Sequence, residues 1–289
     1  MREFDNLVLD GMNIFKTALA TGRDLKTSTG VPSGAVFHSL RTMASAYSNF
    51  KFTNILLLWD RAPYWRKALF PEYKGDRKRE RSEEEIKIFQ DQYEQFREMI
   101  SLLGIAQIEA ESFEADDLAY SMKAHLQGDT LFWSNDHDWL QLIDERHSQY
   151  LPRVKQLITY ANYLEETGYK DPEHLIMIKV LCGDSDNIPG IPGVGPIRAE
   201  KFLRGELSGN LLHKINDFMS SPQYDLNRTL IDLSRCPADP LKSAVLDHGS
   251  PDIEKFFYAC AQLEITSFSN ATWKVISDRA ANSVIPGLA

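Results

Sequence analysis

Short apolar runs and longer stretches with helical spacing follow one another along the first half of the chain. Residues 4–10, 53–60 and 129–138 each carry an apolar run that ends in one or two aspartates, which indicates buried strands. Residues 33–50 and 82–104 place their apolar positions at helical spacing. Strands that alternate with helices predict an α/β fold with a mainly parallel central sheet flanked by helices.

Local signals support the helices between these strands. Ser82 is a candidate N-cap followed by three acids in the first turn, and Gly104 is a stop signal for the same helix. Ser33 is a candidate cap for the earlier helix. A third helix is expected to begin near Glu114, after a strand within residues 105–112.

Acidic side chains end each of these strand candidates or begin the helix that follows. In parallel sheets, sites form beyond the carboxyl ends of the strands, where residues distant in sequence can meet. A single aspartate there is most often a turn or cap residue, but capping uses Ser, Thr and Asn as readily. The repeated choice of acid is therefore a candidate metal-binding pattern. The candidate set is Asp10, Asp60, Glu114, Asp116, Asp117, Asp136, Asp138, Asp184 and Asp186.

Crowded carboxylates need a partner unless water screens them. Two like charges about 4 Å apart repel by about 4 kcal/mol at an effective dielectric near 20. Hard divalent cations such as Mg²⁺ prefer oxygen ligands, and two such ions can support phosphodiester hydrolysis. A calcium-binding EF-hand at Asp184 is excluded, because Pro189 stands where that loop needs glycine. His137, between two acids, is given no role.

Composition narrows the protein class. The chain has 289 residues, 43% hydrophobic and 25% charged, which suits one large or two small globular domains. No apolar run approaches the length of a membrane span, and the first residues lack the layout of a secretion signal. The three cysteines are far apart and form no CxxC, so we expect reduced thiols in a cytoplasmic protein.

The charge is unevenly distributed. The net charge of −9 argues at first against a nucleic-acid partner, but residues 61–81 hold eight bases and three acids and so carry +5. A second candidate contact is the glycine-rich segment 190–201, which is typical of a helix–hairpin–helix turn. Its glycines allow close approach of the backbone to a ligand, and a following helix N-terminus attracts phosphate. The alternative interpretation is an ordinary Pro/Gly-rich loop.

Five motifs in order carry a family resemblance. They are LVLDGMNIFK, WDRAPYWRKALFPEYKGDR, FEADDLA, SNDHDWLQL and GDSDNIPGIPGVG. Together they resemble the 5′ nuclease (flap endonuclease) family, over roughly residues 7–203. That family includes the nuclease domain of bacterial DNA polymerase I and stand-alone phage 5′-3′ exonucleases, and the segment from Pro71 to Glu85 looks especially like the phage enzymes.

The resemblance implies a fold and a division of the chain. It implies a PIN-like nuclease core over residues 1–172 that includes a helical arch at about 61–103. It also implies a helical C-terminal region, 173–289, with a helix-three-turn-helix at about 176–205. Residues beyond about 218 are expected to pack back on the core.

The resemblance also implies roles for individual residues. All nine candidate acids would hold two Mg²⁺ or Mn²⁺ ions, and Lys74 and Arg77 match the family's arch-base cations at the scissile phosphate. Tyr73 is expected to stack on a frayed base, and Arg66 is a further candidate DNA contact. The duplex would be held, with a bound K⁺, by the turn residues Gly190, Gly193 and Gly195 and by Lys201.

One departure from the family pattern concerns the last two acids. The family usually writes G-D-x-x-D-N, whereas residues 183–187 read G-D-S-D-N, with one residue fewer between the acids. Two acids spaced i,i+2 do not share a helix face. We expect the helix to end near Asp184, so that Asp186 reaches the site from a turn.

The function that follows is a structure-specific 5′ nuclease, a 5′-3′ exonuclease and flap endonuclease that hydrolyses DNA with two metal ions. Its expected substrates are DNA with 5′ flaps, nicks or free 5′ ends, with RNA in RNA–DNA hybrids as a variant. We expect a monomer active in replication and repair, with replication proteins as candidate partners, in the host cytoplasm if phage-encoded. Two alternatives remain: a non-catalytic junction-binding protein and a phosphohydrolase of small nucleotides.

Overall fold

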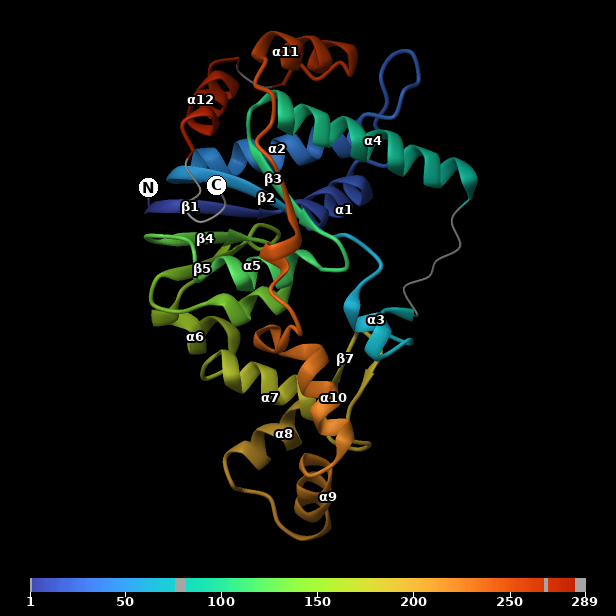
Figure 1. Cartoon of the computed structure of the whole chain (residues 1–289), viewed down its shortest axis with the longest axis vertical. Coiled ribbons are helices and arrows are strands. Elements are labelled where there is room, and N and C mark those ends of the chain that lie inside the picture. The colour runs from blue at the N-terminus through green and yellow to red at the C-terminus, as the bar shows by residue number, and fades with distance from the viewer. Residues whose placement is uncertain (1, 76–81, 268–269, 284–289) are drawn as a thin grey trace.

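A seven-stranded sheet forms the centre of the molecule, and a helical extension lies below it in Figure 1. The structure is a computed structural model and describes residues 2–75, 82–267 and 270–283. The strand order is β6-β5-β4-β1-β2-β3-β9. The strands are β1 (Arg2–Asp10), β2 (Phe50–Trp59), β3 (Ala106–Ala110), β4 (Thr130–Trp133), β5 (His147–Leu151), β6 (Gln156–Ile158) and β9 (Ala244–Asp247).

The inner strands of this sheet are parallel. β1 pairs in parallel with β2 and β4, β2 with β3, and β4 with β5. The edge strands β6 and β9 are antiparallel to their neighbours. The expected α/β fold with a mainly parallel sheet is confirmed. The edge strand β9 was not expected, because the sequence pattern beyond about residue 171 indicated helices only.

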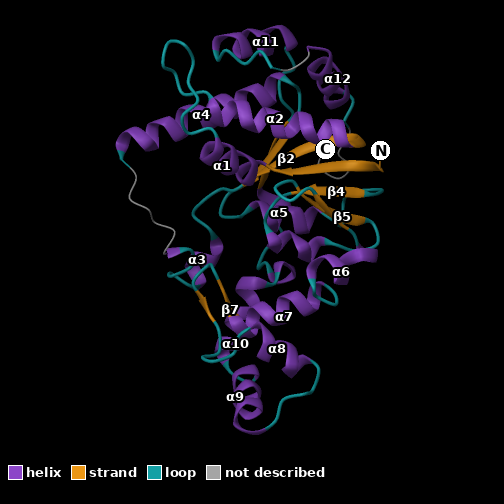
Figure 2. Cartoon of the chain, turned by 180° about the vertical axis from the view of Figure 1, so that it is seen from behind, coloured by secondary structure: helices purple, strands orange, loops and turns teal. Residues whose placement is uncertain are grey.

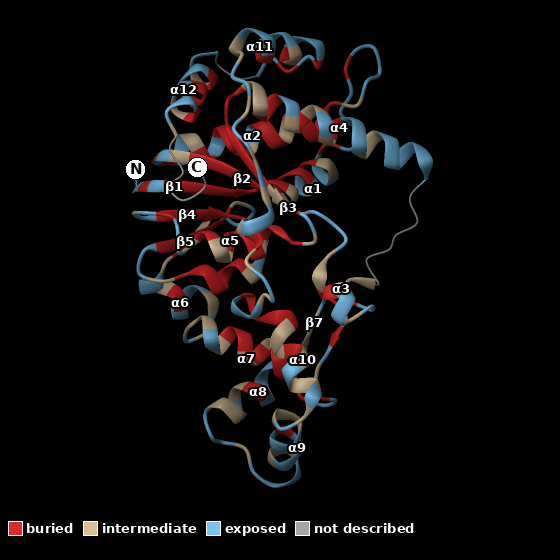
Figure 3. Cartoon of the chain, viewed as in Figure 1, coloured by how far each residue is buried: buried red, intermediate tan, exposed pale blue. Residues whose placement is uncertain are grey.

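Helices cover both faces of the sheet, as the two opposite views in Figures 1 and 2 show. Along β1, Leu7 and Leu9 pack with α1, α2, α4, α11 and α12, whereas Val8 packs with α5 on the other face. Both faces are therefore apolar, which explains the unbroken apolar runs; the strands are red in Figure 3. The helices on the first face are α1 (Gly11–Thr21), α2 (Gly34–Asn49), α4 (Glu83–Leu102), α11 (Ile253–Gln262) and α12 (Asn270–Ala281). On the second face lies α5 (Ala115–Met122).

Element boundaries follow the local signals with some shifts. The Ser82 hydroxyl accepts a hydrogen bond from the backbone N–H of Glu85, and the Glu85 side chain accepts one from Ser82, so the expected cap of α4 is present. Ser33 precedes α2 but makes no side-chain cap hydrogen bond. Strand β2 begins at Phe50, three residues before the expected start, and β4 covers only Thr130–Trp133.

The lower extension begins where α7 leaves the core. Its helices enclose a small two-stranded hairpin, and short helical turns connect several of the other elements. The elements are α3 (Trp65–Leu69), α6 (Tyr163–Thr167), α7 (Pro172–Cys182), β7 (Gly183–Asp184), β8 (Ile188–Pro189), α8 (Pro196–Leu203), α9 (Gly209–Met219) and α10 (Pro222–Ile231). The turns are η2 (His137–Leu142), η3 (Tyr160–Asn162), η4 (Leu233–Arg235) and η5 (Pro240–Ser243).

After α10 the chain returns to the core. The Gln141 side chain donates to the carbonyl of Ile231 and accepts from the N–H of Leu233, which fixes this crossing to η2. Strand β9 then extends the sheet, and α12 packs on the core formed by β2 and α2. Within the described residues, we find no helix with the length and apolar character needed to cross a bilayer.

Candidate active site

The predicted acids gather at the carboxyl ends of β1 to β4. A first cavity of about 150 Å³ is bordered by acids from all four strand ends, and a second, narrower space of about 10 Å³ lies next to it. The first contains Asp10, Asp60, Glu114, Asp116 and Asp136, and the second contains Asp116, Asp138, Asp184 and Asp186. Asp116 faces both spaces, so eight of the nine candidate acids belong to one connected site.

Asp10 occupies the turn from β1 into α1. One carboxylate oxygen accepts from the N–H of Asn13 at 2.9 Å and caps α1, while the other accepts from the Ser134 hydroxyl at 2.7 Å. The next residue must be glycine, because a Cβ at Gly11 would lie 2.8 Å from the ring of Trp59. The strand end and its neighbours therefore hold the Asp10 carboxylate in one orientation.

The start of α5 brings the next acids to the same place. Glu114 is the N-cap of α5, and the N–H of Ala115 donates to Asp60 at 2.9 Å, which ties the end of β2 to this helix. Asp116 and Asp117 follow on different sides of the first turn, since successive helical residues point about 100° apart. Asp116 faces the cavities, whereas Asp117 is buried away from them.

Negative charge in the first cavity exceeds what its surroundings stabilise. Burial, and then the charge of Asp60, raises the pKa of Asp10 to about 7. Burial also raises the pKa of Asp60, although Lys16, 4.0 Å away, opposes this. The pKa of Asp116 is raised well above its usual range by burial and by Glu114. A divalent cation or shared protons would relieve this repulsion.

Two lysines lie between carboxylates of the site. Lys74 bonds to Glu114 and lies 3.6 Å from Asp186. Lys179 bonds to Asp138 and lies 2.6 Å from Asp184. Within the described part of the chain, no three acidic, histidine or cysteine side chains converge closely enough to hold a metal ion. A metal would therefore have to displace one or both ammonium groups.

Burial disfavours charge on Glu114, but the ammonium of Lys74 and the guanidinium of Arg66 outweigh it and hold the pKa of Glu114 below its usual value. The same balance, with Lys179 as the cation, lowers the pKa of Asp184. Lys179 was missed by sequence reasoning. Its only signal was a single charged residue within the apolar stretch of residues 175–182.

Arg66 is not available as the DNA contact that the sequence suggested. Its side chain is 1% exposed and binds the carboxylates of Glu114 and Asp117 at 2.8–2.9 Å, together with the carbonyl of Leu230. The indole of Trp65 donates to Asp117 as well. Arg66 therefore connects α3, α5 and α10 from inside, and Asp117 serves this pair in place of a cavity.

Tyr73 also differs from the expectation. It is 2% exposed, and its hydroxyl donates to Glu114 at 2.9 Å, so its ring cannot stack on a base in this arrangement. Burial, then the charge of Glu114, raises its pKa, so the hydroxyl stays protonated and can donate. Lys74, the next residue, reaches the first cavity as expected. Arg77 lies outside the described residues.

The shortened acidic motif folds as a hairpin. Helix α7 ends at Cys182, and Gly183, with φ +83°, turns the chain into β7. Asp184 pairs with Ile188 across the hairpin, and the backbone carbonyl of Asp186 accepts from the N–H of Lys74 at 3.0 Å. Both acids therefore border the second space, and Asp186 reaches it from a turn, as the spacing suggested.

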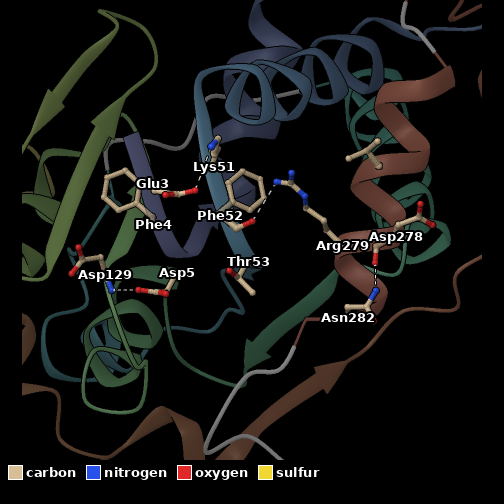
Figure 4. Close-up of a pocket in the computed structure, with 11 residues that line it drawn as sticks. Glu3, Phe4, Asp5, Lys51, Phe52, Thr53, Asp129, Asp278, Arg279 and Asn282 are labelled. Carbon is tan, nitrogen blue, oxygen red and sulfur yellow. Dashed lines mark hydrogen bonds and ion pairs between the residues drawn. The ribbon is translucent and has the colours of Figure 1, made fainter. Parts of the chain in front are cut away.

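A larger cavity of about 660 Å³ lies at the opposite end of β1 and β2 (Figure 4). Seven strand residues separate Glu3 from Asp10, so the two ends are roughly 20 Å apart. The charges that it exposes are already engaged: Glu3 lies 3.5 Å from Lys51, and Asp5 accepts from the N–H of Asp129. The concentration of unbalanced carboxylates thus selects the smaller cavity as the candidate site.

The predicted duplex-binding segment lies in the lower extension. Gly190 follows β8, Gly193 and Gly195 form the turn before α8, and Lys201 is exposed on that helix. This segment is separate from the carboxylates in sequence, yet α7 and its hairpin connect the two directly. His137 is exposed at the start of η2.

Comparisons with known proteins give a consistent result. Residues 5–168 match the family described as "5'-3' exonuclease, N-terminal resolvase-like domain". A "5'-3' exonuclease" of Bacillus subtilis (strain 168) is 30% identical over 240 residues, which cover 78% of this chain and 79% of that protein.

Two solved structures share the fold. The T5 5'-exonuclease with bound divalent metal ions (zinc) has a TM-score of 0.66 at 22% identity, and the match covers 89% of this chain and 99% of that one. A bacteriophage T5 flap endonuclease variant in a complex with DNA and metal ions has a TM-score of 0.63 at 22% identity, covering 97% and 100%.

Proposed function

The chain belongs to the 5′-3′ exonuclease family and is a nuclease, and from this premise we propose that it hydrolyses DNA at 5′ ends, nicks and flaps with two divalent metal ions. The observation that carries this proposal is the meeting of eight carboxylates from separate chain segments in two adjoining spaces. Neither a junction-binding protein nor a nucleotide phosphohydrolase explains so much acid at one point.

The donor set suits hard divalent cations. All of its ligands are carboxylate oxygens, which Mg²⁺ and Mn²⁺ prefer, and the raised pKa of Asp10 marks negative charge that a bound cation would stabilise. We propose one ion among the acids of the first cavity and one among those of the second, with Asp116 between them. The ions would supply an activated water and stabilise the leaving oxygen. Divalent ions are also bound in the similar T5 exonuclease.

The lysines have a role in this scheme. Release of Lys74 from Glu114 and Asp186 would free those acids and leave an ammonium group beside the reacting phosphate, where it can stabilise developing negative charge. Tyr73 and Arg66 keep Glu114 in place from behind while this happens. The chain's own contribution is therefore to position the carboxylates and to provide a mobile cation.

DNA is the proposed substrate because two basic or backbone features flank the acids. One is the basic segment 61–81, and the other is the turn at Gly190–Gly195 with α8. The similar T5 flap endonuclease is described in a complex with DNA. Cleavage of RNA in RNA–DNA hybrids is a variant of the same proposal, and replication proteins remain proposed partners.

One assay separates the proposed function from its alternatives. End-labelled 5′-flap, nicked-duplex, RNA–DNA hybrid and mononucleotide substrates are each incubated with Mg²⁺, Mn²⁺ or EDTA. We expect cleavage of flap and nicked DNA with either ion and none with EDTA. Binding without cleavage would indicate a junction-binding protein, and cleavage of the mononucleotide alone would indicate a nucleotide phosphohydrolase.

The K⁺ ion implied by the resemblance is not part of this proposal. At the turn where it would bind, the carbonyl oxygens of Pro192 and Gly193 already accept hydrogen bonds from cationic side chains. Unlike the carboxylate site, the turn shows no unbalanced negative charge among these groups. The residues of this turn therefore do not fit a bound K⁺.

A further inference from the structure

The turn before α8 directs its carbonyl oxygens at donors from the chain itself. The carbonyl of Pro192 accepts from the ammonium of Lys214, and that of Gly193 accepts from the guanidinium of Arg198, both at 2.5 Å. The carbonyl of Ile191 accepts from the N–H of Val194 at 2.9 Å. Three successive carbonyl oxygens of the turn are thus satisfied, two of them by full positive charges.

Packing of α9 places the lysine. Ile215 is fully buried in one apolar cluster with Ile191 and Val194, so α9 is held against the turn. Lys214 precedes Ile215, and its exposed side chain therefore starts close to Pro192. The cation is delivered by a buried contact 22 residues along the chain, so the contact does not depend on the surface side chain alone.

The backbone of the turn admits the arginine. Gly193 has φ +84°, a conformation that residues with a side chain rarely adopt. A Cβ at this position would lie 3.6 Å from a guanidinium nitrogen of Arg198. Arg198 lies in the first turn of α8, so its side chain can reach back to the carbonyl of Gly193.

Carbonyl oxygens bind K⁺ by replacing its hydration shell. An ammonium or guanidinium group that donates to the same oxygens satisfies them and supplies the same charge. We propose that Lys214 and Arg198 take the place of a K⁺ ion in this turn, so that duplex binding needs no monovalent ion. A tethered cation stays at the turn at an effective concentration that does not fall when bulk K⁺ is removed.

The same groups have donors to spare for DNA. An ammonium carries three N–H donors and a guanidinium five, and one from each is used on a carbonyl. The remaining donors can bind phosphate oxygens at the N-terminus of α8, where the helix dipole also favours an anion. This inference rests on the proposed binding of duplex DNA and defines how that surface is charged.

Fluorescence anisotropy with a labelled nicked duplex in EDTA tests the inference. Potassium chloride is replaced by lithium chloride at constant ionic strength, so that screening is unchanged. We expect the dissociation constant of the wild-type protein to stay within about twofold, because the cations at the turn are covalently attached. Affinity that falls about tenfold in lithium overturns the inference. Failure to bind in either salt instead contradicts the proposed function.

A double variant examines the two side chains directly. Lys214→Met with Arg198→Gln removes both charges, and its folding is checked by thermal melting. We expect it to acquire K⁺ dependence, with binding about tenfold tighter in potassium than in lithium, since K⁺ can then occupy the carbonyls. The control Lys201→Met, on the same helix, should weaken binding equally in both salts. A double variant without K⁺ dependence overturns the inference.

Discussion

The ammonium of Lys179 lies 2.6 Å from a carboxylate oxygen of Asp184 and also bonds to Asp138. These two acids are proposed ligands of the second metal ion, so the lysine occupies the position where a divalent cation would stabilise them. Burial lowers the pKa of Lys179, but the two acids outweigh that effect and raise it, so the group is charged. Metal binding and this ion pair are therefore competing states.

Replacing Lys179 with methionine tests that competition. The variant should be less stable without metal, because two carboxylates lose their cation, yet it should bind Mn²⁺ more tightly. The pair is partly solvated, so we expect about 1 kcal/mol, or roughly a fivefold lower half-saturating metal concentration. Thermal melting against Mn²⁺ concentration measures both effects.

Lys255→Met is the matched control for this change. Lys255 pairs with Asp252 at 3.2 Å on a surface remote from the carboxylates. Its loss should leave the Mn²⁺ dependence of melting unchanged. If Lys179→Met and Lys255→Met respond identically to Mn²⁺, the lysine does not compete with metal.

Asp116 should be the most sensitive single acid, because it borders both cavities. Asp116→Asn keeps the size of the side chain and removes the charge shared by the two proposed ions. Cleavage of a 5′-flap substrate with Mg²⁺ should fall by on the order of 100-fold or more, since electrostatic stabilisation of the transition state is lost. Binding of the same DNA in EDTA should remain within a few-fold of wild type.

Asp217→Asn on the exposed side of α9 provides the comparison for charge removal alone. It should cleave at the wild-type rate. Retained cleavage by Asp116→Asn would remove the central acid from the proposed mechanism.

The general position of the site could be predicted from sequence, because strand ends in a parallel sheet converge wherever the chain closes its βα units. Asp10, Asp60 and Asp136 were identified for that reason. The roles of neighbours within one turn could not be predicted. Asp116 and Asp117 are adjacent and chemically identical, and only the position of the buried Arg66 decides which of them faces the cavity.

Other features depend on contacts that leave little pattern in the sequence. Arg66 and Tyr73 lie among exposed basic residues along the chain, yet α10 covers them, and their burial follows from that packing. Strand β9 has one buried edge contact and alternating partial exposure, so its pattern is weak. Lys179 reveals its role only when the hairpin β7–β8 brings Asp184 back toward it.

Arg66→Met should destabilise the protein without acting primarily on DNA affinity. The guanidinium is fully buried with Glu114 and Asp117, and removal of one partner leaves uncompensated buried charge. We expect a loss of about 3–5 kcal/mol in the free energy of unfolding. Urea denaturation measures this, and Lys67→Met, the next residue of α3, should change stability by less than about 1 kcal/mol. A stable Arg66→Met protein with weakened DNA binding would restore the surface role.

Asp10 predicts a pH dependence for the metal-free protein. Its pKa is about 7 in the folded chain against an ordinary value of 3.8, so between these limits the folded state holds a proton that the unfolded state has released. Stability from this group is therefore complete below about pH 4 and is lost as pH rises through about 7. In EDTA, the free energy of unfolding of the wild type should fall across this window relative to Asp10→Asn, which cannot titrate. Saturating Mg²⁺ should reduce that difference in slope, because the ionised carboxylate then gains a cation in the folded state. Parallel pH profiles for the two proteins in EDTA would show that Asp10 is not a titrating member of the cluster, and with it the main sign of unbalanced charge in the first cavity would be lost.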